Sequence, residues 1–127
     1  MTWQRAPVAA ALVELLAPLD TLVSVFPAPP PTFNAPAAYV SYPQVVSYDG
    51  FAFGVDTVAL PITVAAGLAE SDRIDGLLEQ YKKAINADAT LGGVVPSVRV
   101  NLQQGWRVLT VAGADYLAAD LILEIRA

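Results

Sequence analysis

Apolar residues near the amino terminus recur at helical spacing. Pro7 suits the first turn of a helix, Pro18 stops the pattern, and Glu14 falls on the face opposite to the apolar residues. The apolar stripe consists of Val8, Leu12, Leu15, Leu16 and Leu19. This spacing predicts an amphipathic helix over residues 6–17.

Strand patterns follow this helix, and prolines interrupt them. The segments with alternating or β-branched residues are Thr21–Phe26, Tyr39–Tyr42, Val45–Tyr48 and Thr57–Ala66. Pro43 separates the second segment from the third, which implies an edge strand or a bulge. Pro61 lies within the fourth segment, so we expect that the hydrogen-bond ladder of this strand is not fully paired on both sides.

A second amphipathic pattern predicts a helix over residues 71–87. Ser71 is a good N-cap, and Asp72 and Asp75 lie where the helix dipole favours negative charge. The stripe expected to be buried is Ile74, Leu77, Leu78, Tyr81 and Ile85. The helix therefore presents one apolar face to a core and one charged face to water.

The carboxyl-terminal part of the chain alternates as strands. After a break at Gly92-Gly93, the predicted strands are Val98–Gln103, Trp106–Val111 and Tyr116–Arg126, joined by turns at Gln104-Gly105 and Gly113–Asp115. In the last strand, the side chains expected to point inward are Leu117, Ala119, Leu121, Leu123 and Ile125. Those expected to point outward are Asp120, Glu124 and Arg126.

The order of these elements predicts an α+β fold. We expect an antiparallel (mixed) sheet with two helices packed on one face. The length of 127 residues is enough for one packed core, so residues 1–127 are expected to form a single domain.

Few charged residues are available to cover the surface of this domain. The chain is 55% apolar and only 15% charged, against about 25% charged in an ordinary soluble domain. Large uncharged areas are therefore expected on the exterior, and such areas usually mark contacts with another subunit or partner.

The balance of charge is acidic. The chain has seven basic and twelve acidic residues, so its formal net charge is −5. This charge argues against binding nucleic acid through its phosphates. Lys82-Lys83 is the only adjacent basic pair. Glu79 precedes Lys83 by four residues, so this pair is best interpreted as a solvated helix face.

The residues on which most familiar active sites depend are absent from this sequence. The chain has no cysteine and no histidine, which removes the thiolate nucleophile, the usual general base and the commonest metal ligands. Asp72 and Asp75 could place two carboxylates side by side, but the helix dipole explains them better. No glycine-rich phosphate motif or nucleophile elbow occurs. We expect no enzyme activity, no metal and no cofactor.

The sequence predicts no membrane span. The apolar run from Ala6 to Val13 follows Arg5 in the manner of a short signal peptide, but Glu14 interrupts it, so we interpret it as part of a mature helix. The uncharged stretch from Thr21 to Tyr48 contains several prolines and cannot form one spanning helix.

Two segments are candidates for contacts with other proteins. The first is a stiff, proline-rich connector, for which a ligand of a small adaptor domain is the alternative interpretation. The second is a predicted hairpin tip with two phenylalanines, which either fold back over the sheet or reach a neighbouring protein. The candidate interaction residues are Pro29, Pro30, Pro31, Phe33, Phe51 and Phe53.

Several pieces of the chain occur together in an order typical of one known family. They are the helix-to-strand passage at 6–26, the proline-led strand Pro36–Pro43 (PAAYVSYP), the strand at 57–64, the helix at 72–85 and the closing phrase Gly113–Ile125 (GADYLAADLILEI). In this order the chain resembles the tail terminator (tail completion) proteins of bacteriophages with long, non-contractile tails and of gene transfer agents.

The resemblance implies a structural virion protein at the head-proximal end of the tail, assembled in the host cytoplasm. Such a protein forms a homo-hexameric ring that caps the tail tube protein, ends tube polymerisation and presents its other side to the head-neck connector protein. Genomic DNA passes through the lumen of the ring without specific binding, and an acidic chain suits that passage.

Two other functions stay open at the level of sequence. A neck or head-closure connector protein of the same particle shares the size and the ring symmetry. A small ligand-binding or accessory enzyme domain would instead require a concave polar pocket.

Overall fold

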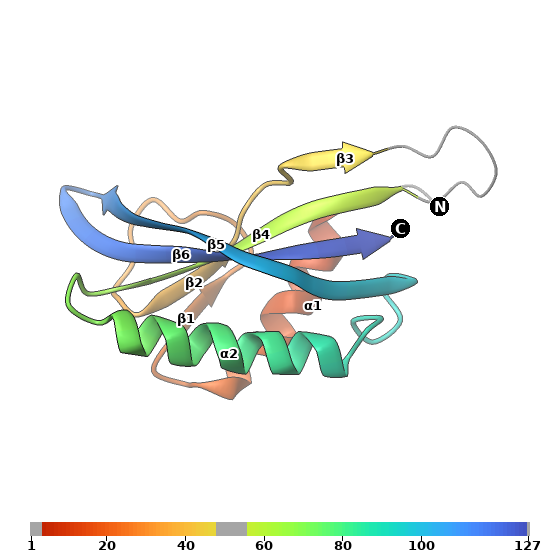
Figure 1. Cartoon of the computed structure of the whole chain (residues 1–127), viewed down its shortest axis with the longest axis horizontal. Helices are drawn as coiled ribbons and strands as arrows, with labels where there is room; N and C mark the ends of the chain where they lie inside the picture. The colour runs from red at the N-terminus through yellow and green to blue at the C-terminus, as the bar shows by residue number, and fades with distance from the viewer. Residues whose placement is uncertain (1–3, 48–55, 127) are drawn as a thin grey trace.

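The computed structural model describes residues 4–47 and 56–126, which form an α+β fold (Figure 1). The helices are α1 (Arg5–Leu16), the short 3-10 helix η1 (Ala17–Leu19) and α2 (Ser71–Ala87). The strands are β1 (Ser24–Phe26), β2 (Ala37–Val40), β3 (Val45–Ser47), β4 (Thr57–Ala66), β5 (Ser97–Val111) and β6 (Ala114–Arg126). The predicted fold class is confirmed, and the bounds predicted for β4 and α2 match the structure.

The strands form one mixed sheet. Its order is β1-β2-β4-β6-β5, and β3 also pairs with β4. β1 and β2 run parallel, whereas the other described pairs are antiparallel. The central strands β4 and β6 pair without a break from Thr57 opposite Arg126 to Ala66 opposite Leu117. They form the centre of the sheet, and the other strands pair on either side of them.

Pro61 occupies a central strand at a place where its neighbour is interrupted. β2 ends at Val40 and β3 begins at Val45, and the Ser41 amide donates to the Pro61 carbonyl at 2.9 Å between them. The N–H and C=O of one residue point to the same side of an antiparallel strand, so the missing N–H of Pro61 falls at this interruption. The predicted gap in the ladder at Pro61 is confirmed.

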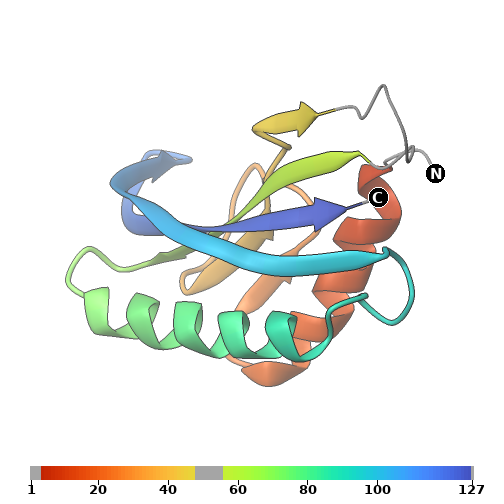
Figure 2. The same cartoon turned by 45° about the vertical axis from the view of Figure 1, so that its right-hand side comes forward.

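Both α-helices pack on one face of the sheet and share one core with it (Figure 2). The sheet supplies alternate residues of β4 and β6 to this core, as the pattern predicted: Val58, Leu60, Ile62, Val64, Leu121, Leu123 and Ile125. The helices supply Val8, Leu12, Leu16, Ile74, Leu77, Leu78, Tyr81 and Ile85. Full burial of each such large apolar side chain contributes about 1.5–3 kcal/mol.

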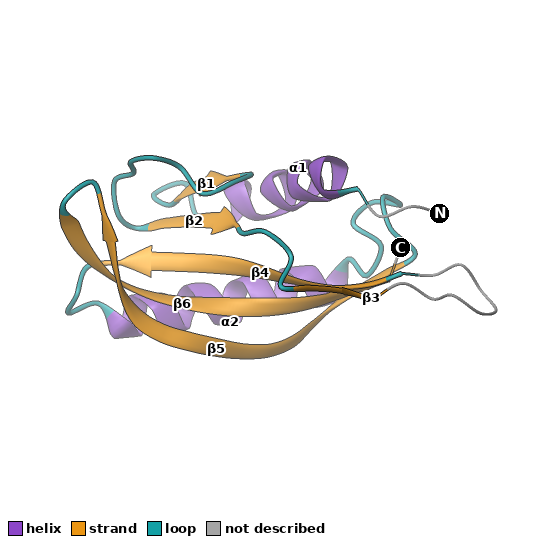
Figure 3. Cartoon of the chain, turned by 90° about the horizontal axis from the view of Figure 1, so that it is seen from above, coloured by secondary structure: helices purple, strands orange, loops and turns teal. Residues whose placement is uncertain are grey.

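The predicted turn at Gln104-Gly105 is wrong, because β5 is one continuous strand. Its register against β6 shifts between Val100 and Leu102 and again between Gln104 and Arg107. The second shift contains Gly105 at φ +79°, a backbone conformation that glycine adopts without strain. A bulge of this kind bends a strand without ending it, and β5 curves across β6 accordingly (Figure 3).

Two smaller predictions are also wrong. Ser71 is the first residue of α2 and not its N-cap; that position belongs to Glu70, which makes no side-chain capping bond. The first strand begins at Ser24, because Asp20 Oδ1 accepts a hydrogen bond from the Leu22 amide at 3.0 Å and holds the preceding residues in a turn.

The helix-free face of the sheet is tightly packed around one carboxylate. Asp120 was expected to point outward, and it does lie on the face opposite the core, but its side chain is buried. An ideal Cβ on Gly105 would lie 3.2 Å from Asp120 Oδ2, which shows that the bulge of β5 covers the carboxylate directly. This burial was not predicted, because the pattern of Gln104-Gly105 indicated a turn where the bulge lies.

Candidate interaction surface

Large apolar side chains are exposed in several places on this chain. They are Leu22, Tyr42, Val45, Leu68, Val94, Trp106 and Val108. Trp106 and Val108 are 43% and 60% exposed on β5, and Leu68 is 56% exposed after β4. Such side chains, on a chain with so few charges, are the strongest sign of protein contact among the described residues.

Three of these side chains belong to the same end of the sheet. Val108 pairs with Leu117 of β6, and Leu117 pairs with Ala66, the last residue of β4. Leu68 follows Ala66 by two residues in the loop that leads to α2. Trp106 precedes Val108 by two residues and lies on the same side of β5. We call Leu68, Trp106 and Val108 the hairpin-end patch; the loop before α2 and the β5–β6 hairpin lie at one end of the molecule (Figure 1).

The bulge that presents this patch is fixed by an ion pair. Arg107 Nη1 lies 3.2 Å from Asp120 Oδ2 and donates a hydrogen bond to the Gly105 carbonyl at 2.8 Å. The guanidinium therefore joins the two sides of the bulge to the buried carboxylate of β6. Trp106, between Gly105 and Arg107, belongs to the segment that these two contacts hold.

A chain of hydroxyl groups continues from this carboxylate across the sheet. Thr63 donates to Asp120 Oδ1 at 2.7 Å, so the bond of 2.9 Å between the Ser41 and Thr63 hydroxyls has Ser41 as its donor. Thr63 is buried, and Asp120 thereby has both oxygens occupied. This polar network joins Ser41, directly after β2, to β4, β6 and β5.

The predicted proline-rich connector packs against the same hairpin. The Phe33 ring lies 4.8 Å from the Tyr116 ring, and the Tyr116 hydroxyl donates to the Phe33 carbonyl at 3.5 Å. Pro29 and Pro31 are exposed, and Pro30 is half-buried. The structure thus brings Phe33 to the hairpin, where it contacts its own chain.

Phe51 and Phe53 lie outside the described residues, so their contact role stays a prediction. The sequence interpretation missed Leu68, Trp106 and Val108 as candidates. No local signal marks them, because apolar residues two apart in a strand are equally typical of a buried face.

A second exposed apolar pair lies where β2 leads into β3. Tyr42 and Val45 are exposed, and the Arg5 guanidinium lies over the Tyr42 ring at 4.7 Å from its centroid. Arg5 also donates to the carbonyls of Pro27 and Val40, both at 2.7 Å. The start of α1 is thereby tied to the edge of the sheet beside this pair.

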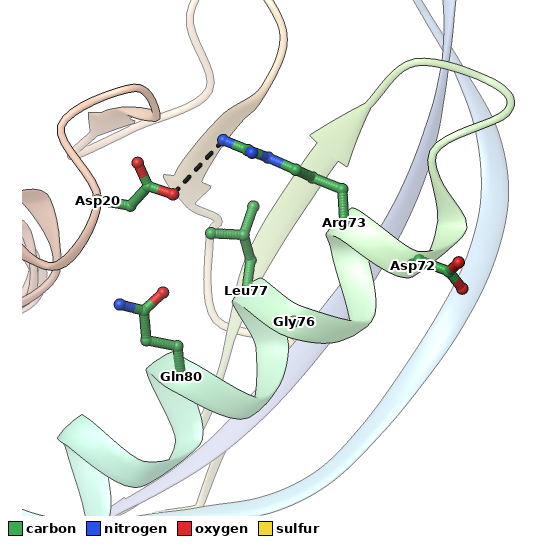
Figure 4. A pocket seen from close by; sticks show the side chains of 6 residues that line it. All are labelled: Asp20, Asp72, Arg73, Gly76, Leu77 and Gln80. Atoms are coloured by element: carbon green, nitrogen blue, oxygen red, sulfur yellow. Dashed lines mark hydrogen bonds and ion pairs between the residues drawn. The ribbon is translucent and has the colours of Figure 1, made fainter.

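A shallow polar depression of about 280 Å³ lies between η1 and α2 (Figure 4). Two contacts join its polar side chains to the rest of the chain: Arg73 Nη2 pairs with Asp20 at 3.4 Å, and Gln80 donates to the Leu19 carbonyl at 2.9 Å, whereas Arg73 Nε has no partner among the described residues. Asp72 points away from this pair in Figure 4. The depression ties α2 to η1, and no nucleophile and base converge in it.

Neither a metal site nor a membrane span emerges from residues 4–47 and 56–126. No three side chains of the metal-binding types cluster there, and Asp72 and Asp75 remain two exposed carboxylates at the start of α2. Over the same residues, no helix has the length and apolar character needed to cross a membrane.

Searches find no matching protein-family model and no matching curated protein.

Proposed function

We propose that this chain is a structural subunit of a phage tail, a terminator that caps the tail tube as a homo-hexameric ring. The observation that carries the proposal is the exposure of large apolar side chains in several separate places: Leu22, Tyr42 with Val45, and Val94, besides the hairpin-end patch. A closed ring requires two different surfaces on each subunit, because each contact joins one surface to another.

The contacts of the polar side chains and the net charge both support a role in assembly rather than in catalysis. The largest polar cluster of the described residues is structural, because the hydroxyl of Thr63 and the guanidinium of Arg107 occupy both oxygens of Asp120. The net charge of −5 suits a ring whose lumen lets DNA slide, because phosphates are repelled from an acidic wall. In this role, one side of the ring meets the tail tube protein and the other meets the head-neck connector protein.

Native mass spectrometry and negative-stain electron microscopy test this function. The purified chain is measured alone, with the tail tube protein of its particle, and with the connector protein. We expect hexameric rings, either alone or on contact with the tube, and tubes that stop growing once capped. Binding to the connector without any effect on tube growth would assign the chain to the neck instead. A chain that forms no ring and changes no tube would overturn the proposal.

A further inference from the structure

We propose that the hairpin-end patch docks a protein other than this chain, one whose surface carries lysine or arginine around an apolar centre. The inference deepens the proposed function and rests on it for the identity of the partner as a neighbouring virion protein. It assigns contacts between copies of the chain to the other exposed apolar residues.

Carboxylates flank the patch. Leu68 is followed directly along the chain by exposed acidic residues at the start of α2, namely Glu70, Asp72 and Asp75. Asp115 is exposed on β6, two residues before Leu117, the partner of Val108. None of these carboxylates lies within 4.0 Å of a cationic side chain in the described part of the molecule. An apolar centre with an acidic rim is complementary to an apolar centre with a basic rim.

A second copy of the chain is poorly suited to supply that basic rim, because its cationic side chains are few and each already contacts a group of its own chain. The chain has seven cationic side chains, and all of them lie in the described residues. Six lie within 4.0 Å of a carboxylate of their own chain: Arg73, Lys82, Lys83, Arg99, Arg107 and Arg126. The seventh, Arg5, donates to two backbone carbonyls and lies over Tyr42. Two such patches facing each other would oppose like charges.

The patch has the composition of a binding centre. Tryptophan is enriched among the residues that dominate binding energy, and Trp106 is presented on a bulge that an ion pair fixes. A preformed surface of this kind loses little conformational entropy when a partner binds. The carboxylate rim then selects a basic partner and makes the association dependent on salt.

The test separates contacts with the partner from contacts between copies. Val108→Ser removes an apolar side chain from the patch, and Ala10→Ser is its control at an exposed position of α1, outside the patch and outside the other exposed apolar residues. Asp72→Asn with Asp75→Asn removes two charges from the rim, and Glu14→Gln with Asp56→Asn removes two charges elsewhere. Each variant is checked for folding by circular dichroism, for ring formation by native mass spectrometry, and for binding to the tail tube protein and to the connector protein by biolayer interferometry at low and high salt.

We expect Val108→Ser to weaken binding to one of the two proteins at least tenfold while rings still form. The double rim variant should weaken the same binding about three- to tenfold at low salt and flatten its salt dependence, whereas the double control should not. Loss of rings in Val108→Ser, or binding by the patch variants equal to that of the controls, would overturn the inference and leave the proposed function standing. A wild-type chain that binds neither protein would overturn both.

Discussion

Thr63 on β4 donates its hydroxyl hydrogen to Asp120 on β6 across 2.7 Å, on the face of the sheet opposite α1 and α2. The two residues pair directly across the strands. The other carboxylate oxygen of Asp120 meets Arg107 at 3.2 Å, so this single side chain joins the centre of the sheet to the bulge of β5. The shape of the hairpin therefore depends on a polar group inside the sheet.

Removal of this carboxylate should destabilise the fold. Asp120→Ala leaves the Thr63 hydroxyl and the Arg107 guanidinium without their acceptor, and we expect the free energy of unfolding to fall by about 2–4 kcal/mol. Urea denaturation followed by circular dichroism measures the change. Asp115→Ala is the matched control, because Asp115 accepts a bond from Thr110 at 2.6 Å but is exposed; its expected cost is below about 1 kcal/mol. Equal costs for the two variants would contradict a special role for Asp120.

Substitution of Gly105, in the bulge of β5, should destabilise the fold. Gly105 has φ +79°, and a Cβ there would lie 3.0 Å from Arg107 Nη1. Gly105→Ala should therefore cost about 1–2 kcal/mol of stability. Gly76 lies within α2, where a Cβ would meet nothing within 4 Å, so Gly76→Ala should stabilise by about 0.5–1 kcal/mol. Thermal unfolding of the two variants beside the wild type shows whether the shifts have opposite signs.

Most of the fold could be predicted from local patterns. The stripe of α2 and the alternation of β4 and β6 reveal which side chains enter the core, because periodicity records one buried face. The position of Pro61 even indicated where the ladder is incomplete. These features depend on residues close together in the sequence.

The bulge and the patch could not be predicted in this way. Gln104-Gly105 has the composition of a turn, and only the pairing with β6 shows that the strand continues. The surroundings of Asp120 depend on two residues that local patterns do not connect with it. Thr63 is distant along the chain, and Arg107 reaches the carboxylate only because of the bulge in β5. Trp106 and Val108 have the alternating apolar pattern of core residues, but both side chains are exposed in the structure.

The attachment of α1 should depend on Arg5. This side chain donates to the carbonyls of Pro27 and Val40, and Arg5→Met would leave both without their donor while keeping much of the apolar stem. We expect a loss of about 1–3 kcal/mol in the free energy of unfolding, measured by urea denaturation. Arg126→Met removes an exposed cation that lies 4.0 Å from Glu124, and it should change stability by less than about 0.5 kcal/mol. A similar small effect of Arg5→Met would show that α1 is held by its apolar stripe alone.

The buried phenol of Tyr81 should make stability fall in alkaline solution. Burial, with a smaller contribution from the negative charge of Asp20, raises the pKa of Tyr81 from 10.0 to about 12. Between these values the unfolded chain has released the phenol proton while the folded chain keeps it, so the unfolded state binds fewer protons and the free energy of unfolding decreases as pH rises. The decrease attributable to this group is about 2–3 kcal/mol between pH 10 and pH 12.

Tyr81→Phe isolates that contribution. The Tyr81 hydroxyl has no hydrogen-bond partner among the described residues, so at pH 7 the variant should be as stable as the wild type or up to about 1 kcal/mol more stable. Above pH 10 its advantage should grow as the wild type loses stability. Denaturation midpoints measured from pH 7 to pH 12 for wild type, Tyr81→Phe and the surface control Tyr42→Phe provide the comparison. Parallel curves for the wild type and Tyr81→Phe would mean that this phenol ionises no differently in the folded and unfolded chain.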